Sequence, residues 1–192
     1  MRGNYCCNCV IDLKKDVALL KSGRNQRLAL IALFCAQAII ISVIERQLPS
    51  PLMVAPGAKI GLANVITCVA LVKLGARDTL KIILVRLVVT AFLTGGLSSL
   101  IYGISGAALS FSGMVLVQKL FNKHISLIGI SVIGGFMHNV GQLLVAVSIA
   151  RTWTIFLYLP VLAVIGIIAG VIVGWVANYL LIHIERLNPT FE

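Results

Sequence analysis

Three polar side chains, His138, Asn139 and Gln142, stand within five consecutive positions of a long apolar stretch. His138 and Gln142 are four residues apart, so in a helix they share a face, with Asn139 beside them. Polar groups at membrane depth are costly unless they face the protein interior or a cavity. The cluster predicts a ligand pocket or a functional polar network, against the alternative of packing residues satisfied within the core. Metal binding by His138 is not expected, because no second histidine or acid stands at ligand spacing.

A second polar segment, residues 56–64, places Lys59 between two glycines and Asn64 about one turn deeper. The proline and glycine at its start break a helix. A helix beginning near Lys59 would present free backbone N–H groups that attract anions, and Lys59 would add charge. Two interpretations are open: a polar site wall that closes over a ligand, or a kinked loop in which Lys59 extends to lipid headgroups.

Arg86 lies inside an apolar stretch. Its charge must be solvated at the membrane interface, or paired with a buried acceptor or with the anionic group of a substrate. Glu45 ends the first apolar run, where pairing with Arg46 or Lys59 is its simplest role. These considerations give six candidate substrate-binding residues: Lys59, Asn64, Arg86, His138, Asn139 and Gln142.

Small residues recur near the start of the first apolar run, at Ala29, Ala32 and Ala36. Small side chains at helical spacing allow another helix to approach closely. This stripe is either an ordinary packing face within the protein or a docking face for another membrane protein.

Several kinds of catalytic site are missing from the sequence. The chain has six acidic residues, and no two form an Asp-rich motif that would hold magnesium against a diphosphate. There is no glycine-rich Lys-Ser/Thr loop for ATP, and no Ser–His–Asp set. We therefore expect no autonomous enzyme activity, no cofactor and no metal site.

The amino-acid composition shows whether the helices that carry these residues lie in water or in a lipid bilayer. Of 192 residues, 59% are hydrophobic and 11% are charged, with a mean hydropathy of +1.04; soluble domains keep about a quarter of their residues charged. The sequence predicts an all-α integral membrane protein, a bundle of six transmembrane helices. We expect a basic tail at 1–24, a membrane domain at 25–186 and a short tail at 187–192. The predicted spans are 25–45, 60–74, 79–94, 97–121, 125–150 and 154–184.

The distribution of basic residues predicts both termini in the cytoplasm. With that orientation the inner segments hold 12 lysines and arginines and the outer segments hold 3, as the positive-inside rule requires. The net charge of +10 then reflects membrane orientation, and nucleic-acid binding is not expected because basic and aromatic residues do not interleave. Cys6, Cys7 and Cys9 leave a zinc site, palmitoylation, a reduced tail or residues upstream of the true start as open alternatives.

The segments 56–64 and 134–142, together with Arg86 and Ser105-Gly106-Ala107, resemble a bacterial membrane family. It is the Gx transporter family, also labelled heptaprenyl diphosphate synthase component I, and the likeness covers about residues 28–181. This family is similar to the substrate-binding S components of energy-coupling-factor transporters, which are six-helix proteins. The resemblance implies a multi-pass protein of the bacterial inner (plasma) membrane. It also implies docking through Ala32 and Ala36 on a transmembrane coupling subunit driven by two ATPases.

The leading hypothesis is thus a membrane-embedded, S-component-like subunit that captures a small molecule and is energised by partner subunits. The second is a non-catalytic accessory subunit of heptaprenyl diphosphate or quinone synthesis that holds a lipid substrate beside a soluble enzyme. The third is a membrane scaffold of a redox assembly. The sequence names no substrate, partner or oligomeric state.

Overall fold

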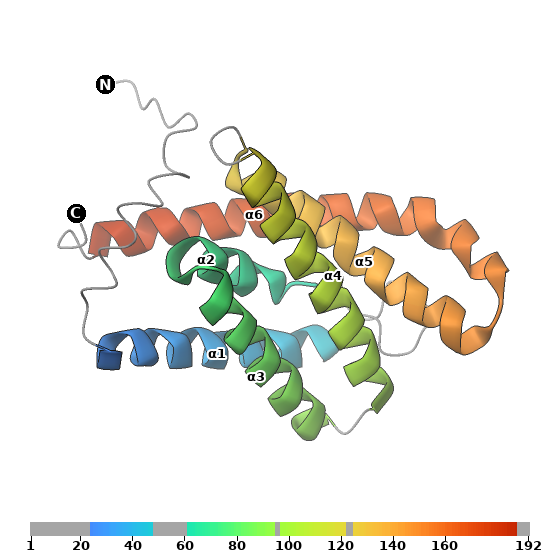
Figure 1. Ribbon diagram of the computed structural model, residues 1–192, viewed down its shortest axis with the longest axis horizontal. Helices are drawn as coiled ribbons and strands as arrows, with labels where there is room; N and C mark the ends of the chain where they lie inside the picture. The colour runs from blue at the N-terminus through green and yellow to red at the C-terminus, as the bar shows by residue number, and fades with distance from the viewer. Residues whose placement is uncertain (1–23, 48–60, 95–96, 122–124, 188–192) are drawn as a thin grey trace.

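The computed structural model of the protein describes residues 24–47, 61–94, 97–121 and 125–187 (Figure 1). Over these ranges the chain is helical and has no strand, which agrees with the predicted all-α class. Residues 1–23, with Cys6, Cys7 and Cys9, lie outside the described ranges, as does Lys59. The domain limits therefore stay predictions. The helices are α1 (Arg24–Gln47), α2 (Asn64–Leu74), α3 (Ala76–Thr94), α4 (Leu97–Phe121), α5 (Leu127–Ala150), the 3-10 helix η3 (Trp153–Tyr158) and α6 (Leu159–Leu187).

Within the described part of the chain, four segments are long and apolar enough to cross a bilayer. They are Arg27–Glu45, Leu97–Phe121, Leu127–Ala150 and Trp153–Leu181, with hydropathies from 1.5 to 2.7. The chain is therefore a multi-pass helical membrane protein. The second predicted span falls short, because α2 has 11 residues. At 1.5 Å per residue it is about 16 Å long, against about 30 Å of hydrocarbon. The six-span count accordingly stays a prediction.

The distribution of side chains is that of a protein in lipid. Large apolar residues such as Leu33, Phe92 and Trp175 are exposed, whereas Arg86, His138, Asn139 and other polar residues are buried. A soluble protein of this size would rarely expose so much contiguous apolar surface. In hydrocarbon the arrangement is the favourable one, because polar groups need partners that only the protein interior can supply.

The short helix α2 lies at the centre of the fold. Its residues 64–71 are all buried, and it contacts each of the other five α-helices. A helix that is apolar all round is typical of such a fully enclosed position. The observed start at Asn64, four residues later than expected, leaves Gly61 and Leu62 as a turn that leads into the helix.

Glycines bring α5 and α6 into backbone contact. A Cβ atom on Gly135 would lie 2.4 Å from the carbonyl oxygen of Gly166, and one on Gly170 would lie 2.5 Å from Cα of Val132. Neither position has room for a side chain, so the two helices pack as closely as helices can. Gly166, Gly170 and Gly174 are spaced four apart and form one face of α6, the small-residue pattern of close helix pairs in membranes.

An ion cluster joins the starts of α1 and α3. Asp78 accepts from Nε of Arg27 at 2.7 Å and from Nζ of Lys81 at 2.9 Å. Burial alone would raise the pKa of the Asp78 carboxyl, but the hydrogen bonds and charges of Lys81 and Arg27 outweigh burial and hold that pKa below its usual value. The start of α1 and the end of α6 lie at the same end of the molecule (Figure 1). Which side of the membrane this end faces remains a prediction.

Candidate functional site

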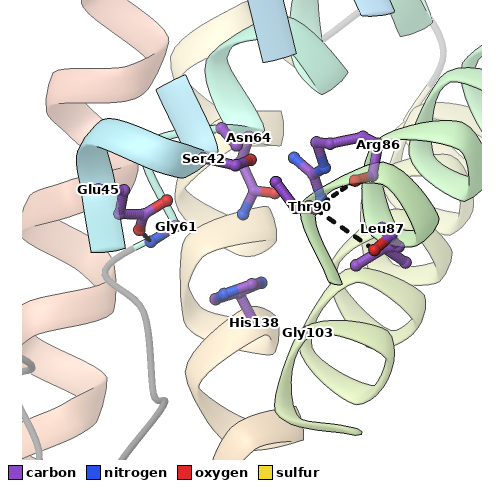
Figure 2. Close-up of a pocket in the computed structure, with 10 residues that line it drawn as sticks. Ser42, Glu45, Gly61, Asn64, Arg86, Leu87, Thr90, Gly103 and His138 are labelled. Carbon is purple, nitrogen blue, oxygen red and sulfur yellow. Dashed lines mark hydrogen bonds between the residues drawn. The ribbon is translucent and has the colours of Figure 1, made fainter. Parts of the chain in front are cut away.

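A polar cavity lies where the end of α1, the start of α2 and the middle of α3, α4 and α5 meet (Figure 2). Its volume is about 20 Å³, which is room for about one water molecule. Six of its lining residues have polar or charged side chains, in a bundle whose outer surface is apolar. The residues that line it are Ser42, Glu45, Gly61, Ala63, Asn64, Arg86, Leu87, Thr90, Gly103 and His138.

Glu45 fixes the turn before α2. Its Oε1 atom accepts hydrogen bonds from the backbone N–H groups of Gly61 and of Leu62, the latter at 3.1 Å. Gly61 has φ +92°, a left-handed conformation that favours glycine. The Glu45 side chain is buried and bonds to this backbone turn. Its expected partners, the Arg46 side chain and Lys59, lie outside the described part of the chain, so that pairing stays a prediction.

Glu45 occupies backbone N–H groups that were expected to be free for an anion at the start of the second helix. The helix begins at Asn64, and a carboxylate of the protein already accepts from the N–H groups just before it. An acidic group near a helix N-terminus is stabilising. The sequence did contain a signal for this role: Glu45 is one of only six acids and stands at the end of an apolar run. Its partner groups are backbone atoms, which composition and spacing do not reveal.

Arg86 is buried in the wall formed by α3, with 5% of its surface exposed. Thr90 donates to the backbone carbonyl of Arg86 and, at 3.4 Å, to that of Leu87. Among the described residues, no group bonds to Nη1 of Arg86. The Glu45 carboxylate lies close enough to interact electrostatically with the Arg86 guanidinium. The side chain therefore does not extend to the membrane interface, which was one of its open interpretations.

His138 forms the floor of the cavity. Its ring nitrogen Nε2 lies 2.8 Å from Nε2 of Gln142, one turn along α5. The ring fits against Gly106 of α4, where a Cβ atom would lie 2.8 Å from Cε1 of His138, and against Gly61, where one would lie 3.2 Å from Cδ2. Both glycines are thus required by the position of the ring.

The structure brings together only part of the predicted set. Asn64, Arg86 and His138 line the cavity, and Gln142 contacts His138 without lining it. Asn139 instead donates to the carbonyl of Leu162 at 2.9 Å, which ties α5 to α6. Lys59 lies outside the described residues. Sequence reasoning missed Ser42, Glu45, Leu87, Thr90 and Gly103 among the lining residues.

Two other predicted features can be placed. Ala29, Ala32 and Ala36 are all exposed on α1, so the described helices leave this face uncovered. Over the part of the chain that the structure describes, no three histidine, cysteine or acidic side chains form a group that could hold a metal ion.

Comparison with known families identifies the chain. The family model described as heptaprenyl diphosphate synthase component I matches residues 34–180, well over half of the sequence. The chain belongs to this family. It is the family also called Gx transporter, as the sequence motifs predicted. No curated protein and no solved structure matches the chain.

All ten residues that line the cavity fall inside the region matched by the Gx transporter family model. Of the exposed alanines of α1, Ala36 lies inside that region, whereas Ala29 and Ala32 precede it. The cavity is therefore part of the family's domain, and the alanine stripe lies at its border.

Proposed function

We propose that this Gx transporter family member is a membrane-embedded substrate-binding subunit of a small-molecule transporter, energised by partner subunits. One observation supports this most: two buried polar atoms in the wall of a single cavity have no hydrogen-bond partner among the described residues, Nδ2 of Asn64 and Nη1 of Arg86. An unpaired buried polar group costs about 1–3 kcal/mol, and more when it is charged. Such groups call for an explanation, and a ligand that pairs with them provides one.

Energy for transport would come from other chains, because the sequence contains no nucleotide-binding loop. The exposed alanines of α1 support docking there of a transmembrane coupling subunit, since small side chains allow a second helix to approach closely. In this proposal Lys59 contributes from the segment ahead of α2. His138 shapes the floor of the site, Gln142 holds the ring of His138, and Asn139 ties α5 to α6. The subunit resides in the bacterial plasma membrane.

The proposal can be tested with the tagged, full-length protein purified gently from its native membrane. We expect a coupling subunit and ATPases to co-purify, and mass spectrometry of the same sample to detect a stoichiometric small molecule. Asn64→Ala should lose that molecule. Asn178→Ala is the matched control, because Asn178 is an exposed asparagine on α6. The proposal fails if neither partners nor a small molecule are recovered, or if both asparagine variants retain the molecule equally.

The family description favours a second candidate, an accessory subunit of heptaprenyl diphosphate synthesis. The words "component I" indicate one part of a larger enzyme, which agrees with the lack of an Asp-rich diphosphate motif in this chain. A strain that lacks the protein would then make quinones with altered side-chain length or in lower amount. Unchanged quinone length and content would remove this candidate.

A further inference from the structure

We infer that the molecule bound in this cavity presents an anionic oxygen group, a carboxylate or a phosphate, to the guanidinium of Arg86 and the amide of Asn64. The inference rests on the proposed capture function and adds the chemical class of the ligand. Two buried nitrogen atoms in the cavity wall have no hydrogen-bond partner among the described residues. Nη1 of Arg86 and Nδ2 of Asn64 are both hydrogen-bond donors. Arginine has five N–H groups and no acceptor, so the missing partner must supply acceptor oxygens.

Both donors belong to one site. The two side chains are each 5% exposed, they come from different helices, and they line the same cavity. Figure 2 shows the guanidinium of Arg86 directed from α3 toward Asn64, above the ring of His138. A guanidinium held by packing, with an amide N–H₂ group beside it, is suited to a planar or tetrahedral oxyanion, because it can donate two parallel hydrogen bonds.

Among the described residues, none supplies that oxyanion. Glu45 is the one carboxylate in the cavity wall. Between the described side chains of Glu45 and Arg86 there is neither a hydrogen bond nor an ion pair. The Oε1 atom of Glu45 accepts instead from the turn before α2. Arg86 thus has an attractive neighbour in Glu45, but its Nη1 atom has no hydrogen-bond partner among the described residues.

The position of Glu45 also restricts the ligand. A second anion next to this carboxylate is repelled, so the bound oxyanion must lie on the side of Arg86 and Asn64. Removing the charge of Glu45 should therefore tighten the binding of a purely anionic probe. Glu45→Gln is the suitable change, because the amide oxygen of glutamine still accepts from Gly61 and Leu62.

The size of the cavity restricts the ligand further. A volume of about 20 Å³ holds about one water molecule. Only the charged end of a ligand fits near Arg86, and its binding must displace the side chains that close the cavity. Two sources can provide such a group: a free carboxylate or phosphate compound, or a prenyl lipid with a diphosphate head.

The experiment measures binding to the full-length protein in detergent by calorimetry. The water-soluble probes are succinate and inorganic phosphate, the lipid probe is farnesyl diphosphate, and succinamide and farnesol are their neutral counterparts. We expect one anionic probe to bind saturably and its neutral counterpart not to bind. Binding by succinate or phosphate assigns the site to free anions, and binding by farnesyl diphosphate alone assigns it to a lipid head.

Variants then test the residues. Arg86→Gln should weaken binding of that probe about tenfold or more, the effect of losing a charge-assisted hydrogen-bond pair. Arg77→Gln is the control, because Arg77 is an exposed arginine on the same helix. Glu45→Gln should strengthen binding. If Arg86→Gln does not fold, Arg86→Lys, which keeps the charge but loses the two-pronged geometry, should still weaken binding.

The inference is wrong if no anionic probe binds, if the neutral counterpart binds as tightly, or if a folded Arg86 variant binds as the wild type does. Its failure is distinguishable from that of the capture function. A neutral small molecule that co-purifies and is lost in Asn64→Ala would refute the anionic class and support capture. Absence of any co-purified molecule and of any partner subunit would refute both.

Discussion

Replacing Gly106 by alanine should displace the floor of the cavity. A Cβ atom at this position would lie 2.8 Å from Cε1, 2.9 Å from Nδ1 and 3.2 Å from Nε2 of His138. Contacts below 3.0 Å require something to shift. The ring cannot move freely, because Gly61 bounds its other side, with a Cβ position only 3.2 Å from Cδ2.

The size of the effect follows from three contributions. Alanine gains about 1 kcal/mol over glycine in a helix interior. Overpacking a dense core costs about 1–3 kcal/mol, and disturbing the 2.8 Å contact of His138 with Gln142 costs about 0.5–1.5 kcal/mol more. We therefore expect Gly106→Ala to lower the stability by about 1–3 kcal/mol.

The matched control is Gly113→Ala on the same helix. There a Cβ atom would meet Cγ of Met137 at 3.0 Å. Methionine is unbranched and adapts to its surroundings, so the helix-propensity gain should prevail and the stability should stay constant or rise.

Both variants can be compared in detergent by unfolding in increasing amounts of a denaturing detergent, with helicity as the readout. Thermal melting gives a second measure, with a shift of about 2–4 °C for each kcal/mol in a chain of this size. Equal stability of the Gly106 and Gly113 variants would show that the ring of His138 is not held between Gly106 and Gly61 as described.

Three further predictions concern the contacts that hold the helices around the site together. Asp78→Asn should weaken the junction with Arg27 by about 1–3 kcal/mol, as expected for bonds to a charged group. Folding lowers the pKa of Asp78. The stability that this junction contributes is therefore present above the usual aspartate pKa and is lost as the pH falls through the lower pKa of the folded state. Melting between pH 7 and pH 3 should show this loss of stability in the wild type and not in the variant. Gly135→Ala should destabilise more than Gly106→Ala, since its Cβ atom would lie 2.4 Å from the rigid carbonyl oxygen of Gly166, and the same detergent unfolding assay checks the order. Asn139→Leu should cost about 1–2 kcal/mol through the lost bond to α6 yet leave the affinity for the anionic probe unchanged in calorimetry, whereas an affinity loss like that of the Arg86 variants would place Asn139 in the binding site.

The features of the fold that follow from hydropathy were predictable. The fourth helix was expected at 97–121 and is observed at Leu97–Phe121, because apolar runs between polar turns define membrane helices directly. The predicted start of the second helix was wrong by four residues. There the turn is fixed by Glu45, which is 16 positions away from Gly61 in the sequence. No local pattern encodes a bond of that range.

The site was predictable as a set of residue types and less so as a set of roles. Polar side chains at membrane depth had to be buried, and Asn64, Arg86 and His138 do line one cavity. Helical spacing placed Asn139 beside His138 but did not show that its amide faces the backbone of Leu162. The glycines of α6 were a further available signal. Their spacing of four marks a close helix pair, and α5 is the helix that packs on them.

Two sets of polar side chains in the described helices have different consequences for stability. Glu45, Ser105 and Asn139 each bond to the backbone of another part of the chain. Helices in lipid gain little from the hydrophobic effect, so such bonds and the glycine contacts hold the bundle together.

Arg86 and Asn64 contribute no such bond through Nη1 and Nδ2. Removing these atoms breaks no hydrogen bond among the described residues and relieves the cost of burying an unpaired group, although Arg86 also attracts the Glu45 carboxylate. The Asn64→Ala variant should therefore keep or exceed the stability of the wild type while it loses ligand. Stability that rises as binding falls is the expected behaviour of residues retained for a ligand, and a loss of both would indicate that they hold the helices together.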